Sequence, residues 1–178
     1  MQRALPAGFS EDAFQHFFAT YHRHTSAADL ASNTLEEQQA ATAHHLIGGS
    51  LRRIGDVNLQ VFTPNQSNWG WGGAHSVVQL VMDDMPFVVD SLTATISRHT
   101  RGIVRILHPI LNVARDEHGN IQSVSDEPTN DSIPESWVEF VIHKLLTPAD
   151  HDALTAAIHR TIASVKEVNA DWLPMREL

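Results

Sequence analysis

The chain has 178 residues, and at about 150 residues per domain it is expected to form one domain, or one domain with an appendage. Twelve Lys and Arg residues stand against 21 Asp and Glu residues, which gives a net charge of −9 at pH 7 with histidine neutral. This acidic balance argues against a nucleic-acid partner and against an anionic membrane surface, because basic side chains provide most of the affinity for both.

The first fifty residues are expected to be a helical N-terminal segment (1–50), followed by a second unit at 56–178. Ser10 precedes two acidic residues, as a helix N-cap does. Four aromatic side chains follow at helical spacing: Phe14, Phe17, Phe18 and Tyr21. A second helix is predicted from about Ser32 or Asn33 to Leu46, with the two following glycines ending it.

Two strands are predicted next. Residues 57–62 alternate apolar and polar side chains, as a half-buried strand does. Residues 65–73 consist of Asn, Gln, Ser, Trp and Gly, and we expect a loop whose two tryptophans fold back onto the domain. Residues 76–82 are almost continuously apolar, which is typical of a buried strand.

A helix is predicted directly after this buried strand. Residues 83–87 read Asp-Asp-Met-Pro-Phe, and a proline near the first helical position with an aspartate before it is a helix-start signal. One helix face is then marked by apolar residues at intervals of four, three and four: Met85, Val89, Leu92 and Ile96. The helix is expected to end between residues 99 and 102.

The second half of the chain is expected to add strands and a last helix. Residues 103–115 are rich in β-branched side chains around Pro109, and since proline cannot donate to a ladder, the strand either has a bulge there or lies at an edge. A short segment at 121–124 and an acidic loop to residue 135 follow.

The last two predicted elements are a strand at 136–145 and a helix from about residue 147. The strand alternates, with Val138, Phe140 and Ile142 on one face and Glu139 and His143 on the other. Residues 147–150 (TPAD) form a capping box with proline at the first helical position, and the helix should reach Trp172 and end at Pro174.

The order of elements from residue 57 is therefore β, β, α, β, β, α. This order is close to the β-α-β-β-α-β plan of ferredoxin-like domains, with the last strand missing and an extra strand in front. We expect residues 57–62 to pair antiparallel with 76–82 in the edge place of the missing strand. The predicted fold is an α+β, permuted ferredoxin-like (ββαββα) antiparallel sheet with two helices on one face, partly covered elsewhere by the N-terminal helices.

The residues that usually carry catalysis are scarce. The absence of cysteine excludes disulfides, thiol nucleophiles and thiolate metal sites, and the only lysines are Lys144 and Lys166. The dinucleotide-binding motif G-x-G-x-x-G does not follow any predicted strand. The nearest candidate, residues 69–73 (WGWGG), has the wrong spacing and precedes a strand. We therefore expect no catalytic residue, metal or cofactor in this chain.

The sequence has no apolar run of about 18 residues, so no transmembrane helix is expected. It also lacks the apolar region of a signal peptide, which predicts a cytoplasmic location.

Twelve histidines raise the alternative of a small metal-dependent enzyme. The candidate ligands are His22, His24, His44 and His45, with Asp12 or Asp29 to complete a site. A His-x-His pair on a helix points its rings about 200° apart, which disfavours shared coordination. His151 and His159 share one helix face but have no carboxylate between them.

The junction at residues 83–87 is the most informative place for function. The exit from a strand into a helix N-terminus presents free backbone N–H groups, which suit an anion. We expect the carboxylates of Asp83, Asp84 and Asp90 to cap and to be solvated, because no nucleophile or metal motif accompanies them. His108 is expected to pack or to bond to the backbone.

The sequence here resembles a known family. DDMPFVVDSL (83–92), ISRHTRGIVRILHPILNVARDEHGNI (96–121) and DWLPM (171–175) are similar to the N-terminal region of the large bacterial NAD-specific glutamate dehydrogenases. The resemblance covers residues 57–178 and is most specific at 83–116. It implies a parent chain several times longer, whose dehydrogenase domain binds NAD and lies downstream.

In that family the corresponding region resembles an ACT domain, a ferredoxin-like module that in many amino-acid enzymes binds amino acids and joins subunits. Its usual loop reads D-x-P-G-x-L. Asp84, Met85 and Pro86 match this loop, and Phe87 stands in the place of the glycine. The resemblance implies a candidate effector loop at these four residues, a possible amino-acid effector, a homo-oligomer, and contacts with the remaining domains of the parent chain. A purely structural subunit-contact domain is a further alternative.

Overall fold

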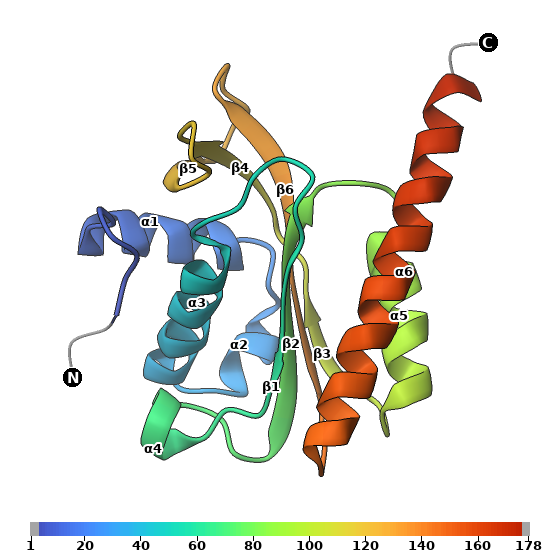
Figure 1. Cartoon of the computed structure of the whole chain (residues 1–178). Coiled ribbons are helices and arrows are strands. Elements are labelled where there is room, and N and C mark those ends of the chain that lie inside the picture. The colour runs from blue at the N-terminus through green and yellow to red at the C-terminus, as the bar shows by residue number, and fades with distance from the viewer. Residues whose placement is uncertain (1–3, 176–178) are drawn as a thin grey trace.

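The computed structural model describes residues 4–175, without the side chains of Asn68 and of residues 171–175 (Figure 1). The strands are β1 (Asn58–Phe62), β2 (His75–Asp83), β3 (Ile103–Leu107), β4 (Ile110–Arg115), β5 (Ile121–Ser125) and β6 (Ser132–His143). The helices are α1 (Glu11–His22), α2 (Ala27–Ala31), α3 (Leu35–Gly49), α4 (Gln66–Trp69), α5 (Val88–His99) and α6 (Pro148–Met175). The class is therefore α+β, as predicted.

The strands form one antiparallel sheet in the order β1-β2-β6-β4-β5, with β3 also paired to β6. β1 pairs antiparallel with β2 at the edge of the sheet, where residues 57–62 were expected. Helices α5 and α6 lie on one face, and α1, α2 and α3 lie on the other (Figure 1). The N-terminal helices thus cover the face that α5 and α6 leave open.

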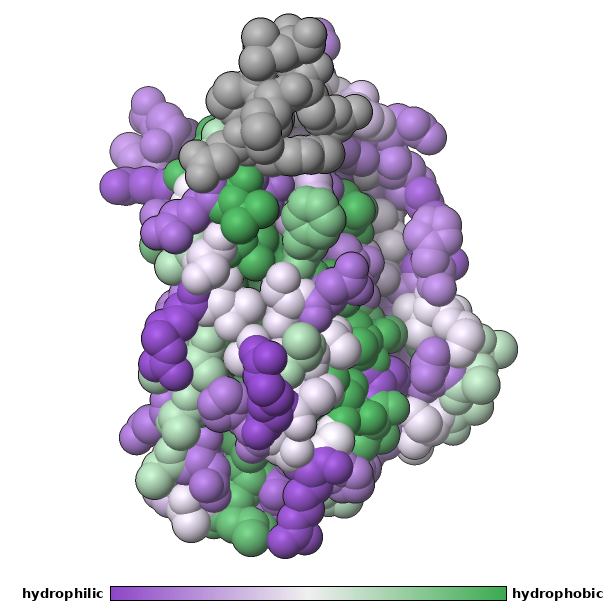
Figure 2. All heavy atoms as spheres, turned by 90° about the vertical axis from the view of Figure 1, so that its right-hand side faces the viewer, coloured by the Kyte–Doolittle hydropathy of each residue, from purple (hydrophilic) through white to green (hydrophobic). Residues whose placement is uncertain are grey.

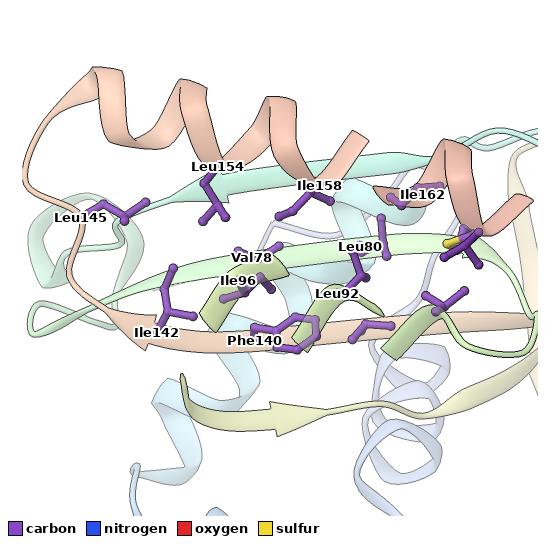
Figure 3. Close-up of a cluster of buried hydrophobic side chains, with 14 residues drawn as sticks. Val78, Leu80, Leu92, Ile96, Phe140, Ile142, Leu145, Leu154, Ile158 and Ile162 are labelled. Carbon is purple, nitrogen blue, oxygen red and sulfur yellow. The ribbon is translucent and has the colours of Figure 1, made fainter. Parts of the chain in front are cut away.

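A separate hydrophobic cluster fills each side of the sheet. Under α5 and α6, Leu154, Ile158 and Ile162 of α6 point toward β2 and β6, with Leu92 of α5 beside them (Figure 3). On the other side, Phe17 of α1 packs edge-on against Trp137 of β6, with ring centroids 5.2 Å apart. Residues of the first fifty therefore share a core with the sheet.

β6 lies at the centre of this arrangement and is buried on both faces. Val138, Phe140 and Ile142 face α5 and α6, as their alternation predicted. Glu139 lies on the opposite face but is only 2% exposed, because the N-terminal helices cover it. The strand also begins four residues earlier than predicted, at Ser132, so part of the expected acidic loop belongs to it.

Two alternatives were expected around Pro109, a bulge or an edge position. Among the described residues there is no bulge, since β3 and β4 pair with β6 in one continuous register across Pro109. β3 pairs with β6 alone there and so lies at an edge of the sheet. Leu107 lies opposite Glu139 and Ile110 lies opposite Ser136, so three residues separate the pairs on both strands. Pro109 keeps its carbonyl oxygen, which accepts from the Trp137 N–H at 3.0 Å. The register shift occurs instead between Ile103 and Arg105.

Several helix ends differ from the sequence prediction for reasons visible in the caps. α3 begins at Leu35, because Thr34 and Glu37 form a capping box. α5 begins at Val88 rather than at Pro86, and its N-cap Phe87 has a left-handed backbone with φ of 70°. α6 starts with the predicted capping box of Thr147 and Asp150. It includes Pro174 rather than ending there.

Two short helices, α2 and α4, were not predicted at all, and α4 lies within the expected loop at 65–73. The tryptophans of that loop do fold back: Trp71 is buried and Trp69 stacks on Phe62 at 4.9 Å. Among the described residues, no helix is both long and apolar enough to cross a membrane.

Candidate functional site

The four residues of the candidate loop lie together between β2 and α5. Asp84, Met85, Pro86 and Phe87 line a hollow of about 310 Å³ that is completed by the first turn of α5 and by two residues of the neighbouring strands, His108 and Ile110. The sequence therefore identified one side of the hollow. The other side comes from the strand segment around Pro109, which reaches the loop only through sheet pairing.

A chain of three side chains holds Asp84 in place. The Ser136 hydroxyl donates to Asp84 Oδ1 at 2.6 Å, and the Asp84 N–H donates to the carbonyl oxygen of Pro134 at 3.1 Å. His108 Nε2 lies 3.1 Å from the same hydroxyl oxygen, and because the hydroxyl proton points to Asp84, we assign the N–H to His108. Asp84 is exposed, as expected for a solvated carboxylate, but it does not cap the helix.

His108 bonds to a side-chain hydroxyl and not to the backbone, which was one of the two roles expected for it beside packing. Loss of solvent around the ring lowers the pKa of His108, and the nearby charge of Asp84 acts in the opposite direction. The neutral imidazole is therefore the form that this hydrogen-bond chain favours near neutral pH.

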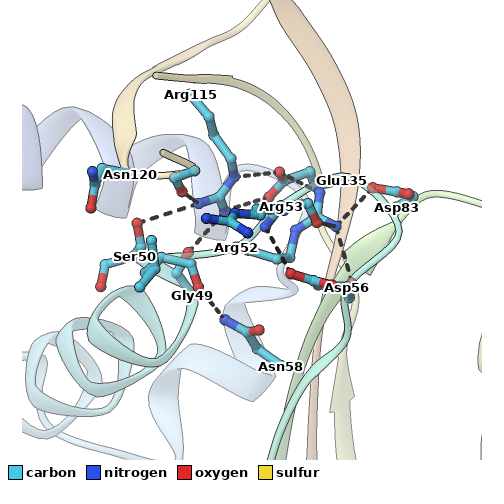
Figure 4. Close-up of polar contacts among 12 residues, drawn as sticks. Gly49, Ser50, Arg52, Arg53, Asp56, Asn58, Asp83, Arg115, Asn120 and Glu135 are labelled. Carbon is cyan, nitrogen blue, oxygen red and sulfur yellow. Dashed lines mark hydrogen bonds and ion pairs between the residues drawn. The ribbon is translucent and has the colours of Figure 1, made fainter. Parts of the chain in front are cut away.

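Asp83, the preceding residue, belongs to a buried ionic network (Figure 4). Arg52 Nη1 lies 2.7 Å from Asp83 Oδ1, and Arg52 Nη2 lies 2.6 Å from Glu135 Oε1. Arg115 approaches the same carboxylate of Glu135 with two nitrogens, at 2.7 and 2.9 Å. Two arginines and two carboxylates thus neutralise one another. The Asp83 side chain is still 29% exposed, so it is partly solvated as expected, but it pairs with Arg52 instead of capping the helix.

The electrostatics of the network follow from its burial. Burial alone would lower the pKa of Arg52, but the hydrogen bonds and charges of Glu135 and Asp83 outweigh it and raise that pKa. Arg115 additionally donates to the carbonyl oxygens of Gly49 at 2.8 Å and Gly119 at 2.9 Å. A cation at the carboxyl end of α3 also suits the helix dipole. The network thus joins α3, β2, β4 and β6 beneath the loop.

Phe87, which the resemblance placed opposite a glycine, adopts a glycine-like backbone. Its φ of 70° is the only positive value at a non-glycine residue in the described part, and its side chain is 52% exposed. The loop is also tied to α6, because Asn169 Nδ2 donates to the Pro86 carbonyl oxygen at 3.1 Å. A bulky side chain has therefore been placed on a backbone that normally requires glycine.

The backbone N–H groups that are available to bind an anion differ from those expected. The Asp84 N–H is already used and Pro86 has none, so two of the four predicted residues have no free N–H to offer. Within the described residues, no side-chain hydrogen bond caps the N-terminus of α5. The first turn of α5, at residues 88–90, therefore faces the hollow without a capping side chain that would compete with an anion. A carboxylate would meet this turn.

The histidines examined as metal ligands serve as structural hydrogen-bonding groups. His45 Nδ1 lies 2.8 Å from the Tyr21 hydroxyl and its Nε2 lies 3.2 Å from the Leu80 carbonyl oxygen. His22 bonds to Thr42 and His44 bonds to Gln79. Burial lowers the pKa of His45 to about 3 and that of His22 to about 4. Over the described part of the chain, no group of three His, Asp or Glu residues could hold a metal ion.

Fold and site together define the class: an ACT-like α+β domain whose strand-to-helix loop is held at one end of an antiparallel sheet. The chain belongs to the family described as "Glutamate dehydrogenase, ACT1 domain", whose model matches residues 17–158. Comparison with solved structures gives no significant match.

Two curated relatives are named as NAD-specific glutamate dehydrogenases. The chain is 26% identical over 169 residues to the NAD-specific glutamate dehydrogenase of Halomonas elongata, a match that covers 93% of this chain and 10% of that protein. It is also 26% identical over 120 residues to the NAD-specific glutamate dehydrogenase of Pseudomonas aeruginosa, covering 66% of this chain and 7% of that protein. The chain therefore spans about a tenth of the length of these relatives.

Proposed function

We propose that this chain is the N-terminal regulatory or assembly domain of an NAD-specific glutamate dehydrogenase and is itself non-catalytic. The parent enzyme would convert L-glutamate, NAD and water into 2-oxoglutarate, ammonia and NADH in the cytoplasm. The observation that carries the proposal is the family match over residues 17–158, supported by two relatives named for this activity. NAD and the catalytic residues would belong to the remaining domains of the parent.

The regulatory form of the proposal has an amino acid bound at the loop of Asp84, Met85, Pro86 and Phe87. Its carboxylate would accept from the N–H groups of the first turn of α5, where the helix dipole favours an anion. The exposed carboxylate of Asp90 at the rim offers a partner for its ammonium group. The anchoring of Asp83 and Asp84 holds the loop ready for such a ligand.

Titration calorimetry with a panel of amino acids at millimolar concentration tests the regulatory form. We expect heat from at least one amino acid, and a loss of at least tenfold in affinity in Asp90→Asn. Arg53→Ala, an exposed change in the turn that follows Arg52, is the matched control and should leave binding unchanged. If no amino acid gives heat, the sensor role is wrong and the assembly role remains.

Phe87→Gly is a second test of the same loop. If Phe87 blocks an ACT-type site, the variant should gain affinity for an amino acid, because removing the side chain lets the ligand approach the backbone. A variant that only changes stability, without any gain in binding, would show that Phe87 is not a blocking residue.

The assembly form of the proposal uses the outer edge of β3. Among the described residues this edge pairs with no further strand, and it displays Val104 and Ile106 at 49% and 37% exposure. An unpaired edge with apolar side chains favours antiparallel pairing with a second copy about a two-fold axis. Light scattering should show a dimer that Ile106→Lys dissociates, whereas a monomeric wild-type chain would contradict this form.

A further inference from the structure

The outer surface of the two-helix layer contains a groove that shares only Phe87 with the candidate loop. It runs between α5 and α6 and has a volume of about 530 Å³. Figure 2 faces this surface and shows pale, weakly polar side chains in its middle, with green apolar ones above and long purple ones below. Between its two ends the groove is lined by small residues: Ser91, Ala94, Thr95, Thr161 and Ser164.

The floor of the groove is closed, and its hydroxyl groups are hydrogen-bonded to each other. The hydroxyls of Thr95 and Thr161 lie 2.7 Å apart and join the two helices. Because the small side chains above them project little, the helix backbones are approachable along the whole groove. The lining runs from Phe87 to His99 on the α5 side and from Ala157 to Val168 on α6, so its length is about 17 to 18 Å at 1.5 Å per residue. Three turns of a further helix match that length.

The two ends of the groove differ in chemistry. Phe87 and Val168 form an apolar end, with exposures of 52% and 55%. Arg98, His99 and Arg160 form the other end, and none of the described lining residues is acidic. This is unusual for a chain with a net charge of −9. The groove therefore complements a partner that is apolar at one end and anionic at the other.

We propose that the groove binds an amphipathic α-helix from outside this chain, with its apolar side chains at Phe87 and Val168 and its carboxylates at Arg98 and Arg160. Small residues in the floor allow close helix packing, and the basic end selects the charge and the direction of the partner. A second copy of this chain fits poorly. A two-fold axis across the groove would place the basic end of one copy against the apolar end of the other, and an axis along the groove would place the two basic ends together.

Fluorescence polarisation with designed helical peptides tests this proposal. The probes are two labelled 15-residue peptides with leucines along one face and two glutamates at the N-terminal or the C-terminal end. One of them should bind the wild-type chain, and the double variant R98E/R160E should weaken that binding at least tenfold. The same peptide with lysines in place of the glutamates should bind R98E/R160E better than the wild type.

Two variants keep the outcome clear. Ala94→Trp fills the exposed middle of the groove and should weaken peptide binding at least tenfold, whereas Arg53→Glu removes a distant exposed positive charge and should not. Circular dichroism checks that both variants are folded. The proposal is overturned if neither peptide binds, if R98E/R160E binds equally well, or if light scattering shows that the groove joins two copies and that Ala94→Trp separates them.

Discussion

Arg52 and Glu135 form an ion pair of 2.6 Å in which neither side chain exposes any surface to solvent. The two residues are 83 positions apart in the chain. Arg115 and Asp83 complete their neutralisation from β4 and β2. A buried pair of this kind contributes little net free energy compared with an apolar pair, but removing one member leaves the other charge buried and unpaired.

Arg52→Met should therefore destabilise the fold strongly. We expect the free energy of unfolding to fall by about 3–5 kcal/mol, because Asp83 and part of Glu135 lose their cationic partner. Arg53→Met is the matched control, since Arg53 is exposed, and its change should stay within about 0.5 kcal/mol. Denaturant unfolding followed by circular dichroism measures both, and equal stabilities would show that the network is dispensable.

Phe87 allows a comparison of two small replacements at one left-handed position. Phe87→Ala keeps a Cβ atom on a backbone with φ of 70°, whereas Phe87→Gly removes it. The two variants lose nearly the same side chain, so their difference isolates backbone strain. We expect the glycine variant to be more stable by about 1 kcal/mol in chemical denaturation. An alanine variant that is as stable as the glycine variant would show that the loop relaxes to a negative φ.

The buried His45 predicts a loss of stability in mild acid. Its pKa is about 3 in the fold against an ordinary value of 6.5, so below pH 6.5 the unfolded chain binds a proton that the folded chain excludes. Its contribution is complete above pH 6.5 and is lost as the pH falls toward 3, at about 1.4 kcal/mol per pH unit.

The slope of stability against pH, rather than stability itself, is the measurement for this prediction. Urea unfolding at pH 7, 6 and 5 should show that His45→Gln loses less stability than the wild type, by about 0.7 kcal/mol between pH 7 and 6 and about 1.2 kcal/mol between pH 6 and 5. His118→Gln changes a largely exposed ring, at 73% side-chain exposure, and should leave the slope as in the wild type. An unchanged slope in His45→Gln would mean that His45 titrates normally in the fold.

Two adjacent glycines of α3 should respond to alanine with opposite signs. A Cβ at Gly49 would clash with the indole ring of Trp137, and a Cβ at Gly48 would meet only the flexible end of Gln60 at 3.1 Å. Gly49→Ala should cost about 3 kcal/mol through overpacking, while Gly48→Ala should gain up to about 1 kcal/mol from helix propensity. Thermal unfolding of both variants decides this, and a stable Gly49→Ala would show that Trp137 moves aside.

The general arrangement could be predicted because it depends on local patterns. The apolar run at 76–82, the helical spacing from Met85 to Ile96 and the alternation around Phe140 each specify an element from neighbouring residues. The place of β1 beside β2 followed from counting strands against a known plan, and the structure confirms that pairing.

The residues that hold the candidate site could not be predicted in the same way. Arg52, Ser136 and Glu135 meet the loop through contacts across the sheet, and such pairs leave no periodic signal in the sequence. Arg115 lies in the segment that resembles the family, which was the one available hint. The prediction that the helix ends at these glycines is confirmed, since α3 ends at Gly49, but the need of Trp137 for the space beside Gly49 left no sign in the sequence.

The central position of β6 also has a consequence for synthesis of the protein. β6 pairs with β2, β3 and β4, and it contributes side chains to both large hydrophobic clusters. It ends only at His143, so a chain growing on the ribosome exposes the aromatic face of α1 and the apolar side of β2 until that segment has emerged. Neither hydrophobic cluster can therefore be completed during translation before β6 has emerged.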